Sequence, residues 1–395
     1  MSESIALATL ATTLLLVLYT YVGYPLLLRL IGSVSSRSIP TPGEGHEWPN
    51  ISFSVPAYNE EAQIEELIKS LLALDYPPDR MEILVVSDAS DDATDDIVQS
   101  YADQGVRLLR MPERGGKNKA ENAAAHELGS DIIVNTDASI RIAPDALKPL
   151  IAVFSDPAIG CASGRDVSVG SAHEIANAGE SGYVGYEMKI RDMETRVCGI
   201  VGASGCFYGI RSQLHRLPLP EQYSRDFSAA LHAQEHGYRP ASVTDAVCYV
   251  PRTPSLRKEY RRKVRTITRG MQTLWFKRHL MNPFRHRCFA WMLFSHKVCR
   301  WALPWAVTAA GLALLVLAAS GQVWAQAMVA AGVLLLSLAA IGWMRSEAES
   351  VPKLFSVPAY LVAGNLAAMH AFLRAVSGGG DALWEPTRRE VVKAR

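Results

Sequence analysis

Apolar and polar positions alternate along residues 50–135 in a pattern that predicts strands and helices in turn. Strands are predicted where short apolar runs occur, at residues 51–55, 82–86, 106–109 and 131–134, and the run at 82–86 is expected to be buried. Helices are predicted where apolar residues recur at helical spacing, at residues 60–74, 92–103 and 117–128. Because alternating strands and helices are joined by right-handed crossovers, the region is predicted to be an α/β domain with a mostly parallel, Rossmann-like sheet.

Three further stretches are long and almost free of charge. Residues 4–28 carry no charged side chain and are long enough to cross a bilayer. The acidic Glu3 and the lack of a small-residue cleavage site favour a retained anchor over a signal peptide. Residues 301–344 are uncharged and are interrupted by Ser320-Gly321-Gln322, which predicts two spans and a short turn. Residues 354–373 include polar side chains that are costly in lipid, so this segment is expected either to span or to re-enter.

Charge changes the picture at one place in the chain. Lysine plus arginine (40) nearly balances aspartate plus glutamate (39), which argues against a general nucleic-acid binder. However, residues 252–300 hold 14 lysines and arginines and a single acid, Glu259, with aromatic residues between them. This pattern, next to membrane spans, predicts interfacial helices that contact membrane lipids rather than nucleic acid. The six cysteines show no metal-site or disulfide spacing and are expected to be free thiols.

These patterns divide the chain into five parts. They are an anchor (1–32), the α/β domain (48–250), basic interfacial helices (251–300), a membrane region (301–376) and a basic tail (377–395). The basic cluster places the α/β domain on the cytoplasmic side of the cell membrane. Three later spans would put the basic tail outside, whereas re-entry of 354–373 would return it to the cytoplasm, and both topologies remain open.

Polar clusters follow each of the four predicted strands. In parallel sheets ligands bind at the carboxyl ends of the strands, and there the sequence places 58–61, 87–92, 114–119 and 135–139. Asp88 is predicted to bind a nucleobase or ribose, although its neighbours also suit a helix cap. Gly115-Gly116-Lys117 suits a phosphate, or simply a turn. Asp137 suits a divalent cation held against a diphosphate, but the position two residues later is Ser139 rather than a second carboxylate.

Four segments, in order, resemble the successive motifs of family 2 glycosyltransferases. They are Val55-Pro-Ala-Tyr-Asn-Glu-Glu61, Val86-Ser-Asp-Ala-Ser-Asp-Asp-Ala-Thr94, Gly115-Gly-Lys117 and Asn135-Thr-Asp-Ala-Ser139. The resemblance implies a GT-A fold, a nucleotide-sugar donor and an inverting displacement. It assigns nucleoside binding to Asp88, metal binding (Mg²⁺ or Mn²⁺) to Asp137 and the general base to Asp226 within Ser224-Arg-Asp-Phe227. The remaining donor-binding residues that it implies are Pro56, Tyr58, Glu60, Lys117 and Arg269.

Processive members of the family carry a Q-x-x-R-W motif before their later spans. Here Thr266-Ile-Thr-Arg269-Gly270 keeps only the arginine. Arg269 is expected either to reach the diphosphate or to be one more basic interfacial residue. Whether the protein synthesises long glycan chains stays open.

The resemblance implies a membrane-bound, hexosyltransferase-type enzyme, as in polysaccharide biosynthesis. It is expected to move a sugar from a nucleotide-diphosphate donor, by family a UDP-sugar, to a glycan or lipid-linked acceptor. One alternative is transfer to a polyprenyl phosphate. A second is a degenerate membrane scaffold or sugar-sensing subunit, which Ser139 and Gly270 favour and which the intact Asp88, Asp137 and Asp226 oppose. A transporter is disfavoured because the spans are few and mostly apolar.

Overall fold

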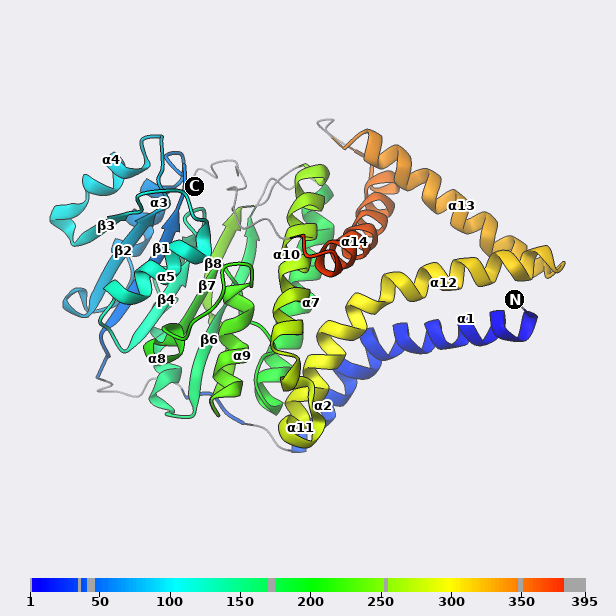
Figure 1. The fold of residues 1–395 in the computed structure, drawn as a ribbon, viewed down its shortest axis with the longest axis horizontal. Helices are drawn as coiled ribbons and strands as arrows, with labels where there is room; N and C mark the ends of the chain where they lie inside the picture. The colour runs from blue at the N-terminus through cyan, green and yellow to red at the C-terminus, as the bar shows by residue number, and fades with distance from the viewer. Residues whose placement is uncertain are drawn as a thin grey trace.

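The chain forms an α/β domain from which long helices extend to one side (Figure 1). The computed structural model describes residues 2–34, 37–40, 47–169, 175–251, 255–346 and 351–379. Most of the predicted basic tail, from residue 380 on, therefore lies outside the described residues.

An eight-stranded sheet forms the centre of the domain, in the order β3-β2-β1-β4-β7-β6-β8-β5. The strands are β1 (Ile51–Ala57), β2 (Met81–Ser87), β3 (Val106–Arg110), β4 (Ile132–Thr136), β5 (Arg141–Ile142), β6 (Ile159–Val169), β7 (Phe207–Arg211) and β8 (Arg239–Pro251). Strands β1 to β4 are mutually parallel, which confirms the predicted crossovers. Strand β7 runs antiparallel between β4 and β6, and β5 runs antiparallel to β8. All four strands predicted from apolar runs are present.

The helices of the domain are α3 (Ile64–Leu72), α4 (Thr94–Gln99), α5 (Lys117–Glu127), α6 (Leu147–Ala152), α7 (Ile175–Val197), α8 (Ser212–His215) and α9 (Arg225–Glu235). Two of them are shorter than predicted. The segment before α3 is a turn, closed by a bond from Gln63 N to Glu60 O (2.8 Å). After α4 the chain tightens into a 3₁₀ turn that ends at Gly105, whose φ of 86° only glycine adopts readily.

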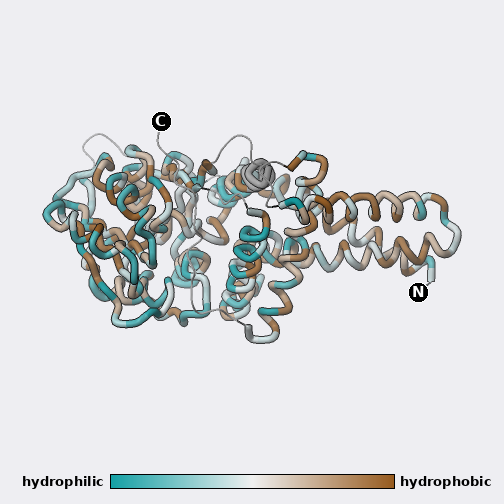
Figure 2. Tube along the Cα trace, turned by 90° about the horizontal axis from the view of Figure 1, so that it is seen from above, coloured by the Kyte–Doolittle hydropathy of each residue, from teal (hydrophilic) through white to brown (hydrophobic). Residues whose placement is uncertain are grey.

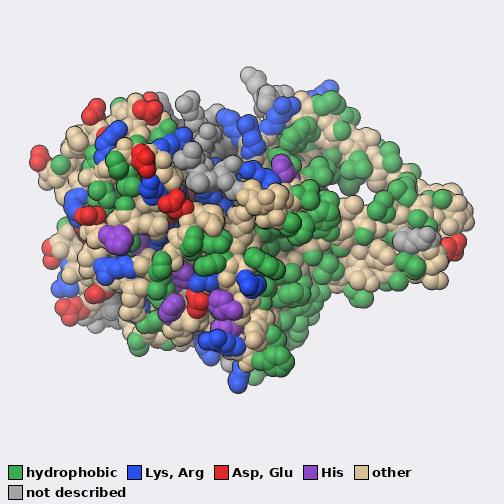
Figure 3. Space-filling model, viewed as in Figure 1, with side chains coloured by type: hydrophobic (Ala, Val, Ile, Leu, Met, Phe, Trp, Pro, Cys, Tyr) green, Lys and Arg blue, Asp and Glu red, His purple; other side chains and the backbone are tan. Residues whose placement is uncertain are grey.

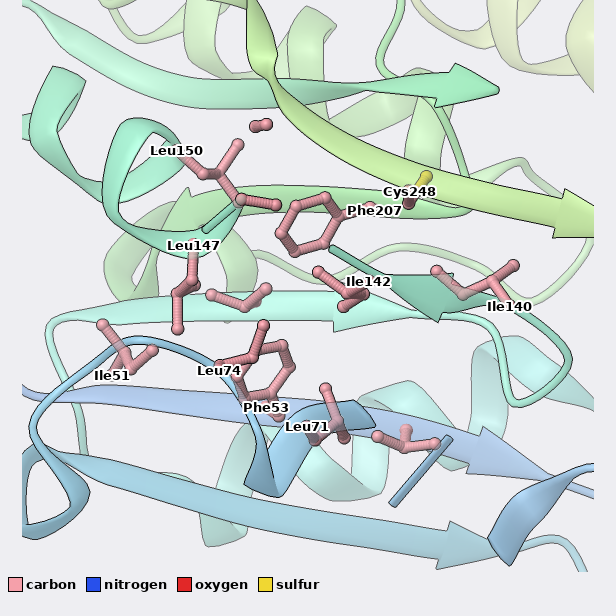
Figure 4. Close-up of a cluster of buried hydrophobic side chains, with 14 of the residues drawn as sticks. Ile51, Phe53, Leu71, Leu74, Ile140, Ile142, Leu147, Leu150, Phe207 and Cys248 are labelled. Carbon is pink, nitrogen blue, oxygen red and sulfur yellow. The ribbon is translucent and has the colours of Figure 1, made fainter. Parts of the chain in front are cut away.

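Apolar residues cover both faces of the sheet. On one face, Phe53 of β1 and Phe207 of β7 pack against Leu71, Leu147 and Leu150 from the helices (Figure 4). On the other face, Leu84, Val86 and Ile133 pack against alanines of α5 and α9, at 120, 124, 229, 230 and 233. Alanine lets these two helices approach the sheet closely, so the residues at their amino-terminal ends are held firmly at one edge of it.

The remaining helices are α1 (Glu3–Leu18), η1 (Tyr19–Gly23), α2 (Tyr24–Val34), α10 (Leu256–Phe276), η5 (Arg278–Met281), α11 (Pro283–Leu293), η6 (Phe294–Cys299), α12 (Arg300–Ala319), α13 (Val323–Met344) and α14 (Lys353–Val376). Four helical stretches in the described chain are long and apolar enough to cross a membrane, namely Glu3–Val34, Pro283–Ala319, Val323–Met344 and Lys353–Val376. The turn predicted at residues 320–322 joins α12 to α13, as expected. Apolar residues dominate the projecting pair of helices in Figure 2, while both signs of charge cover the α/β domain in Figure 3.

A buried polar network fixes the projecting helices to the domain. Tyr24 Oη donates to Glu194 Oε1 on α7 (2.5 Å), and His296 Nδ1 lies 2.6 Å from the same oxygen. Arg300 Nη1 donates to Glu187 Oε2 (2.6 Å). Because these partners come from α2, η6, α12 and α7, the membrane helices and the sheet have a defined relative position. All six cysteines are free, as predicted.

Candidate active site

The loops that follow β1 and β2 are interlocked at the carboxyl edge of the sheet. Asn59 N donates to Ser90 Oγ (3.2 Å), and Asp91 N donates to Asn59 Oδ1 (3.0 Å). Asn59 (φ 51°) and Ala89 (φ 57°) both adopt the left-handed conformation. For an alanine this conformation costs about 1–2 kcal/mol, and such strain is typical of functional loops that their surroundings hold in place.

Asp88 anchors the glycine loop that follows β3. It is 2% exposed, and its two oxygens accept hydrogen bonds from Gly115 N and Gly116 N, each at 2.7 Å. Gly116 has a φ of 88°, which glycine adopts without strain. The nucleoside contact expected for Asp88 remains a prediction, and the observed contacts give the carboxylate a second task of shaping the loop before Lys117.

Replacing Asp88 with asparagine is expected to weaken binding of the donor's nucleoside diphosphate, UDP by the family resemblance, about 10-fold or more. An amide retains one acceptor oxygen, while its NH₂ group opposes one glycine N–H, so a charge-assisted bond worth about 1.5–3 kcal/mol is lost. Calorimetric titration with UDP measures the effect, and Asp96→Asn at an exposed position on α4 is the control. An unchanged dissociation constant would contradict this role for Asp88.

Lys117 and Asp137 meet where α5 begins and β4 ends. Lys117 is the first residue of α5, and its Nζ lies 2.5 Å from Asp137 Oδ1. Burial alone would lower the pKa of Lys117, but the carboxylates of Asp137 and Glu121 outweigh burial and raise it. The ammonium is therefore charged and is paired with Asp137 at this edge.

Asp226 lies in the first turn of α9, across a loop from Asp137. Its Oδ1 accepts a hydrogen bond from Ser224 Oγ. A Cβ atom on Gly205 would lie 2.7 Å from Asp226 Oδ2, so this close approach requires glycine. The next residue, Cys206, has its Sγ 4.0 Å from Asp137 Oδ2. The two carboxylates thus flank one short loop, and their assigned roles remain predictions.

The side chains of the site could hold a divalent cation only together with the phosphate groups of a bound donor. Among the described residues no group of three or more His, Cys, Asp or Glu side chains could hold a metal ion. Asp137 offers one carboxylate. Magnesium is commonly held in proteins by one or two carboxylates together with substrate phosphates and water, so Asp137 and a bound diphosphate form a chemically sufficient ligand set.

The other predicted donor-binding residues line the edges of this area. Pro56 is buried at the end of β1, and the ring of Tyr58 lies 3.9 Å below the guanidinium of Arg114. Glu60 N donates to Thr94 Oγ1 (2.8 Å), which ties the first loop to α4. Arg269 lies on α10, one turn before Thr273.

Thr273 brings the face of α10 that carries Arg269 towards α9. Its Oγ1 accepts a hydrogen bond from Ser224 N at 2.9 Å, next to Asp226. Residues four apart share a helix face, so Arg269 lies on the side of α10 that faces the start of α9.

The sequence reasoning missed two charged residues behind the site. Glu121 lies 3.9 Å from Lys117, and Arg225 lies 3.6 Å from Glu121. Glu121 follows Lys117 by four residues, which is the spacing of a helical ion pair. Such pairs are usually solvent-exposed, so the spacing alone did not indicate burial.

Comparison with known proteins shows the family and the fold of the chain. Residues 52–216 match the model of the family described as glycosyl transferase family 2. An N-acetylglucosaminyltransferase of Bradyrhizobium elkanii is 30% identical over 124 residues, which are 30% of this chain and 68% of that protein. A beta-monoglucosyldiacylglycerol synthase of Synechocystis is 31% identical over 137 residues, covering 34% of this chain and 29% of that one. The matched stretches span about a third of the length of several such relatives.

One solved structure resembles nearly the whole chain. It is the mannosyltransferase PcManGT from Pyrobaculum calidifontis, determined in complex with GDP-Man and Mn²⁺. The TM-score is 0.70 at 23% identity, and the likeness covers 95% of this chain and 98% of that chain. It confirms the expected GT-A fold together with the long apolar helices. On its sequence motifs, its fold and its relatives, the chain belongs to glycosyl transferase family 2.

Proposed function

We propose that the protein is an inverting glycosyltransferase that moves a sugar from a nucleotide-diphosphate donor to a hydroxyl group of a membrane lipid or lipid-linked glycan. One observation carries the proposal: Lys117 and Asp137, 2.5 Å apart, and Asp226 meet at the sheet edge where the Asp88-anchored glycine loop ends. A degenerate scaffold would not need a half-buried lysine and two carboxylates gathered in one small area.

The residues in the donor half of the site bind the nucleotide sugar and orient it. The nucleoside lies near Tyr58 and Asp88, and the glycine loop leaves space for the backbone to approach a phosphate. Lys117 supplies positive charge to the diphosphate, whose charge grows as the sugar leaves. A divalent cation bound by Asp137 would add further stabilisation of the leaving group.

The acceptor half activates the nucleophile. Asp226 takes the proton from the acceptor hydroxyl as its oxygen attacks the anomeric carbon, and the bond to the diphosphate oxygen breaks on the opposite side. Attack from behind inverts the configuration, so an α-linked donor gives a β-linked product. A phosphate acceptor is already ionised and needs no base, so Asp226 favours a hydroxyl acceptor over a polyprenyl phosphate.

A lipid acceptor follows from where Asp226 lies. Its neighbour Ser224 is bound to Thr273 of α10, and Tyr223 stacks on Phe276 of the same helix with ring centroids 4.5 Å apart. Helix α10 in turn packs on the apolar α14. One relative is named for the synthesis of a glycosylated diacylglycerol, and a lipid hydroxyl is the kind of acceptor that this neighbourhood suits.

The transfer is tested with membranes that contain the protein and a radiolabelled nucleotide sugar. Label that passes into the organic phase as a sugar of inverted anomeric configuration supports the proposal. Label that stays only in water-soluble material, with nucleotide released, would contradict a lipid acceptor.

The distribution of basic residues supports one orientation of the protein in the membrane. In Figure 1 the amino terminus and the turn between α12 and α13 lie at the end farthest from the sheet. Neither residues 1–3 nor 320–322 contain lysine or arginine, whereas residues 252–300 contain 14. Because lysine and arginine are retained on the cytoplasmic side, the α/β domain is proposed to be cytoplasmic.

Helix α14 is proposed to lie in the interface rather than to span. Leu256 of α10 packs against Ala359 and Ala363, and further along α10 Val264 packs against Ala367 and Ala371. The two helices therefore run side by side in the same direction. If α14 spanned the bilayer, α10 would span with it.

The basic residues of α10 make a membrane-spanning position of this helix energetically unfavourable. Helix α10 carries seven basic residues, at 257, 258, 261, 262, 263, 265 and 269. Each would cost about 2.5–3.5 kcal/mol at the centre of a membrane helix. An interfacial α14 leaves three spans and returns the basic tail to the cytoplasm, which agrees with the positive-inside tendency.

Reporter fusions are expected to show a cytoplasmic carboxyl terminus. Alkaline phosphatase fused after Arg395 should be inactive, and green fluorescent protein at the same place should fluoresce. Alkaline phosphatase inserted at Gly321, in the far turn, should be active. An active phosphatase after Arg395 would show that α14 spans.

A further inference from the structure

One carboxylate lies fully buried behind the site, between two cations. Glu121 of α5 is 1% exposed. Its Oε1 is 3.9 Å from Lys117 Nζ, and its Oε2 is 3.6 Å from Arg225 Nε. An ionised carboxylate is very costly in such surroundings unless it is paired, so its place in the core depends on both cations.

Each of these cations also adjoins a carboxylate proposed to act in the reaction. Lys117 Nζ is 2.5 Å from Asp137 Oδ1, on the donor side. Arg225 directly precedes Asp226, on the acceptor side. Glu121 therefore joins the two halves of the site through a chain of charges in which Glu121 and Arg225 are buried and Lys117, Asp137 and Asp226 are partly exposed.

Arg225 is anchored at both ends of its guanidinium group. Nη1 donates to the backbone carbonyl of His215 (3.0 Å), and Nη2 donates to Asn122 Oδ1. With Nε beside Glu121, the plane of the group is fixed. Because Arg225 begins α9, holding this side chain also holds the first turn of the helix, where Asp226 lies.

A small cavity with mixed polar and apolar lining adjoins Arg225. Its volume is about 10 Å³, and Tyr208, His215, Arg225 and Ser228 form part of its wall. Four buried atoms of these residues have no hydrogen-bond partner in the protein, namely Tyr208 Oη, His215 Nδ1, Arg225 Nε and Ser228 Oγ. A cavity needs roughly 10–15 Å³ and two to four polar partners to hold a water molecule, and this cavity meets both conditions.

The protonation of His215 suits such a water. Burial, with Arg225 and Arg216 nearby, holds the pKa of His215 well below its usual range, so the ring is neutral. Its Nε2 lies 3.1 Å from Asn135 Oδ1. A neutral ring that donates from Nε2 leaves Nδ1 as an acceptor, which a water molecule in the cavity can satisfy.

We propose that Glu121, Arg225 and a water molecule bound among Tyr208, His215 and Ser228 form a positioning network for Asp226. The network holds the carboxylate towards the acceptor and couples it electrostatically to the Lys117–Asp137 pair. It rests on the proposed function, because it assigns Asp226 the role of base. Glu121 touches neither donor nor acceptor and is a positioning residue.

The network has a consequence for turnover. Without the negative charge of Glu121, Arg225 loses one of the three groups that hold its guanidinium. The first turn of α9, which carries Asp226, is then held less firmly. The loss should therefore appear in kcat rather than in donor binding.

The substitution Glu121→Gln tests this directly, with Glu127→Gln on the exposed face of the same helix as the matched control. Glu121→Gln is expected to lower kcat about 10-fold or more, as is typical when a partner that orients an active-site group is lost. The dissociation constant for UDP should change less than about threefold, so that the loss lies in kcat and not in donor binding. A variant with the kcat of the wild type overturns the proposal.

A second variant provides an independent test in case Glu121→Gln does not fold. Tyr208→Phe keeps the packing of the ring and removes only the hydroxyl group in the cavity wall. It is expected to lower kcat several-fold at unchanged UDP affinity, and a wild-type kcat would overturn the place of the cavity in the network. A wild-type protein that turns over no donor would instead contradict the proposed function, so the two failures are distinguishable.

Discussion

Asp226→Asn is expected to lower turnover by about 10²–10⁴-fold, the usual contribution of a general base. Asparagine is nearly the same size and can still accept the hydrogen bond from Ser224 Oγ, so the start of α9 should keep its place. It cannot take a proton from the acceptor hydroxyl. The loss should therefore appear in kcat, while UDP binding, which involves the opposite side of the loop, stays near the wild-type value.

Single-turnover transfer from a labelled donor measures this effect, and calorimetry measures UDP binding. Glu221→Gln, at an exposed position five residues earlier, is the matched control. Turnover within a few-fold of the wild type would remove Asp226 from the mechanism and would restore a phosphate acceptor, which needs no base.

Asp137→Asn is expected to lower turnover by about 10²–10³-fold, comparable to the loss of one group that stabilises developing charge. Two effects combine. The proposed cation loses its protein carboxylate, and Lys117 loses the partner that lies 2.5 Å away. Unlike Asp226→Asn, this variant should also lose the ability of Mn²⁺ to strengthen UDP binding.

Calorimetric titration with UDP, with and without Mn²⁺, separates these effects, and Asp145→Asn at an exposed position is the control. If the metal strengthened UDP binding equally in Asp137→Asn and in the wild type, the cation would have to bind elsewhere.

The fold was largely predictable because the strands beside β1 are buried on both faces. Such strands read as short continuous apolar runs, and all four runs at residues 51–134 became neighbouring parallel strands. Parallel pairing then placed the polar clusters at one edge. The helix bounds were less predictable, since the turn at Glu60–Gln63 and the 3₁₀ turn after α4 share the apolar spacing of a helix.

The parts that the sequence did not reveal depend on contacts between distant segments. Asp88 holds Gly115 and Gly116, which lie 27 and 28 positions further along the chain. Glu121 is buried because Arg225 reaches it from α9. The proposed orientation of α14 follows from its packing on α10, which hydropathy along α14 alone does not record.

Lys117, Asp137 and Asp226 are proposed to form the site at which the protein turns over a nucleotide sugar. The most direct measurement is nucleoside diphosphate release by the purified full-length protein in lipid, with native acceptor lipids present. The donors are UDP-N-acetylglucosamine, UDP-glucose and GDP-mannose, each with Mn²⁺ or Mg²⁺ and after chelation. We predict release from one donor, lost on chelation and in Asp137→Asn. No release from any donor under these conditions would contradict the proposed glycosyltransferase activity and favour the role of a membrane scaffold.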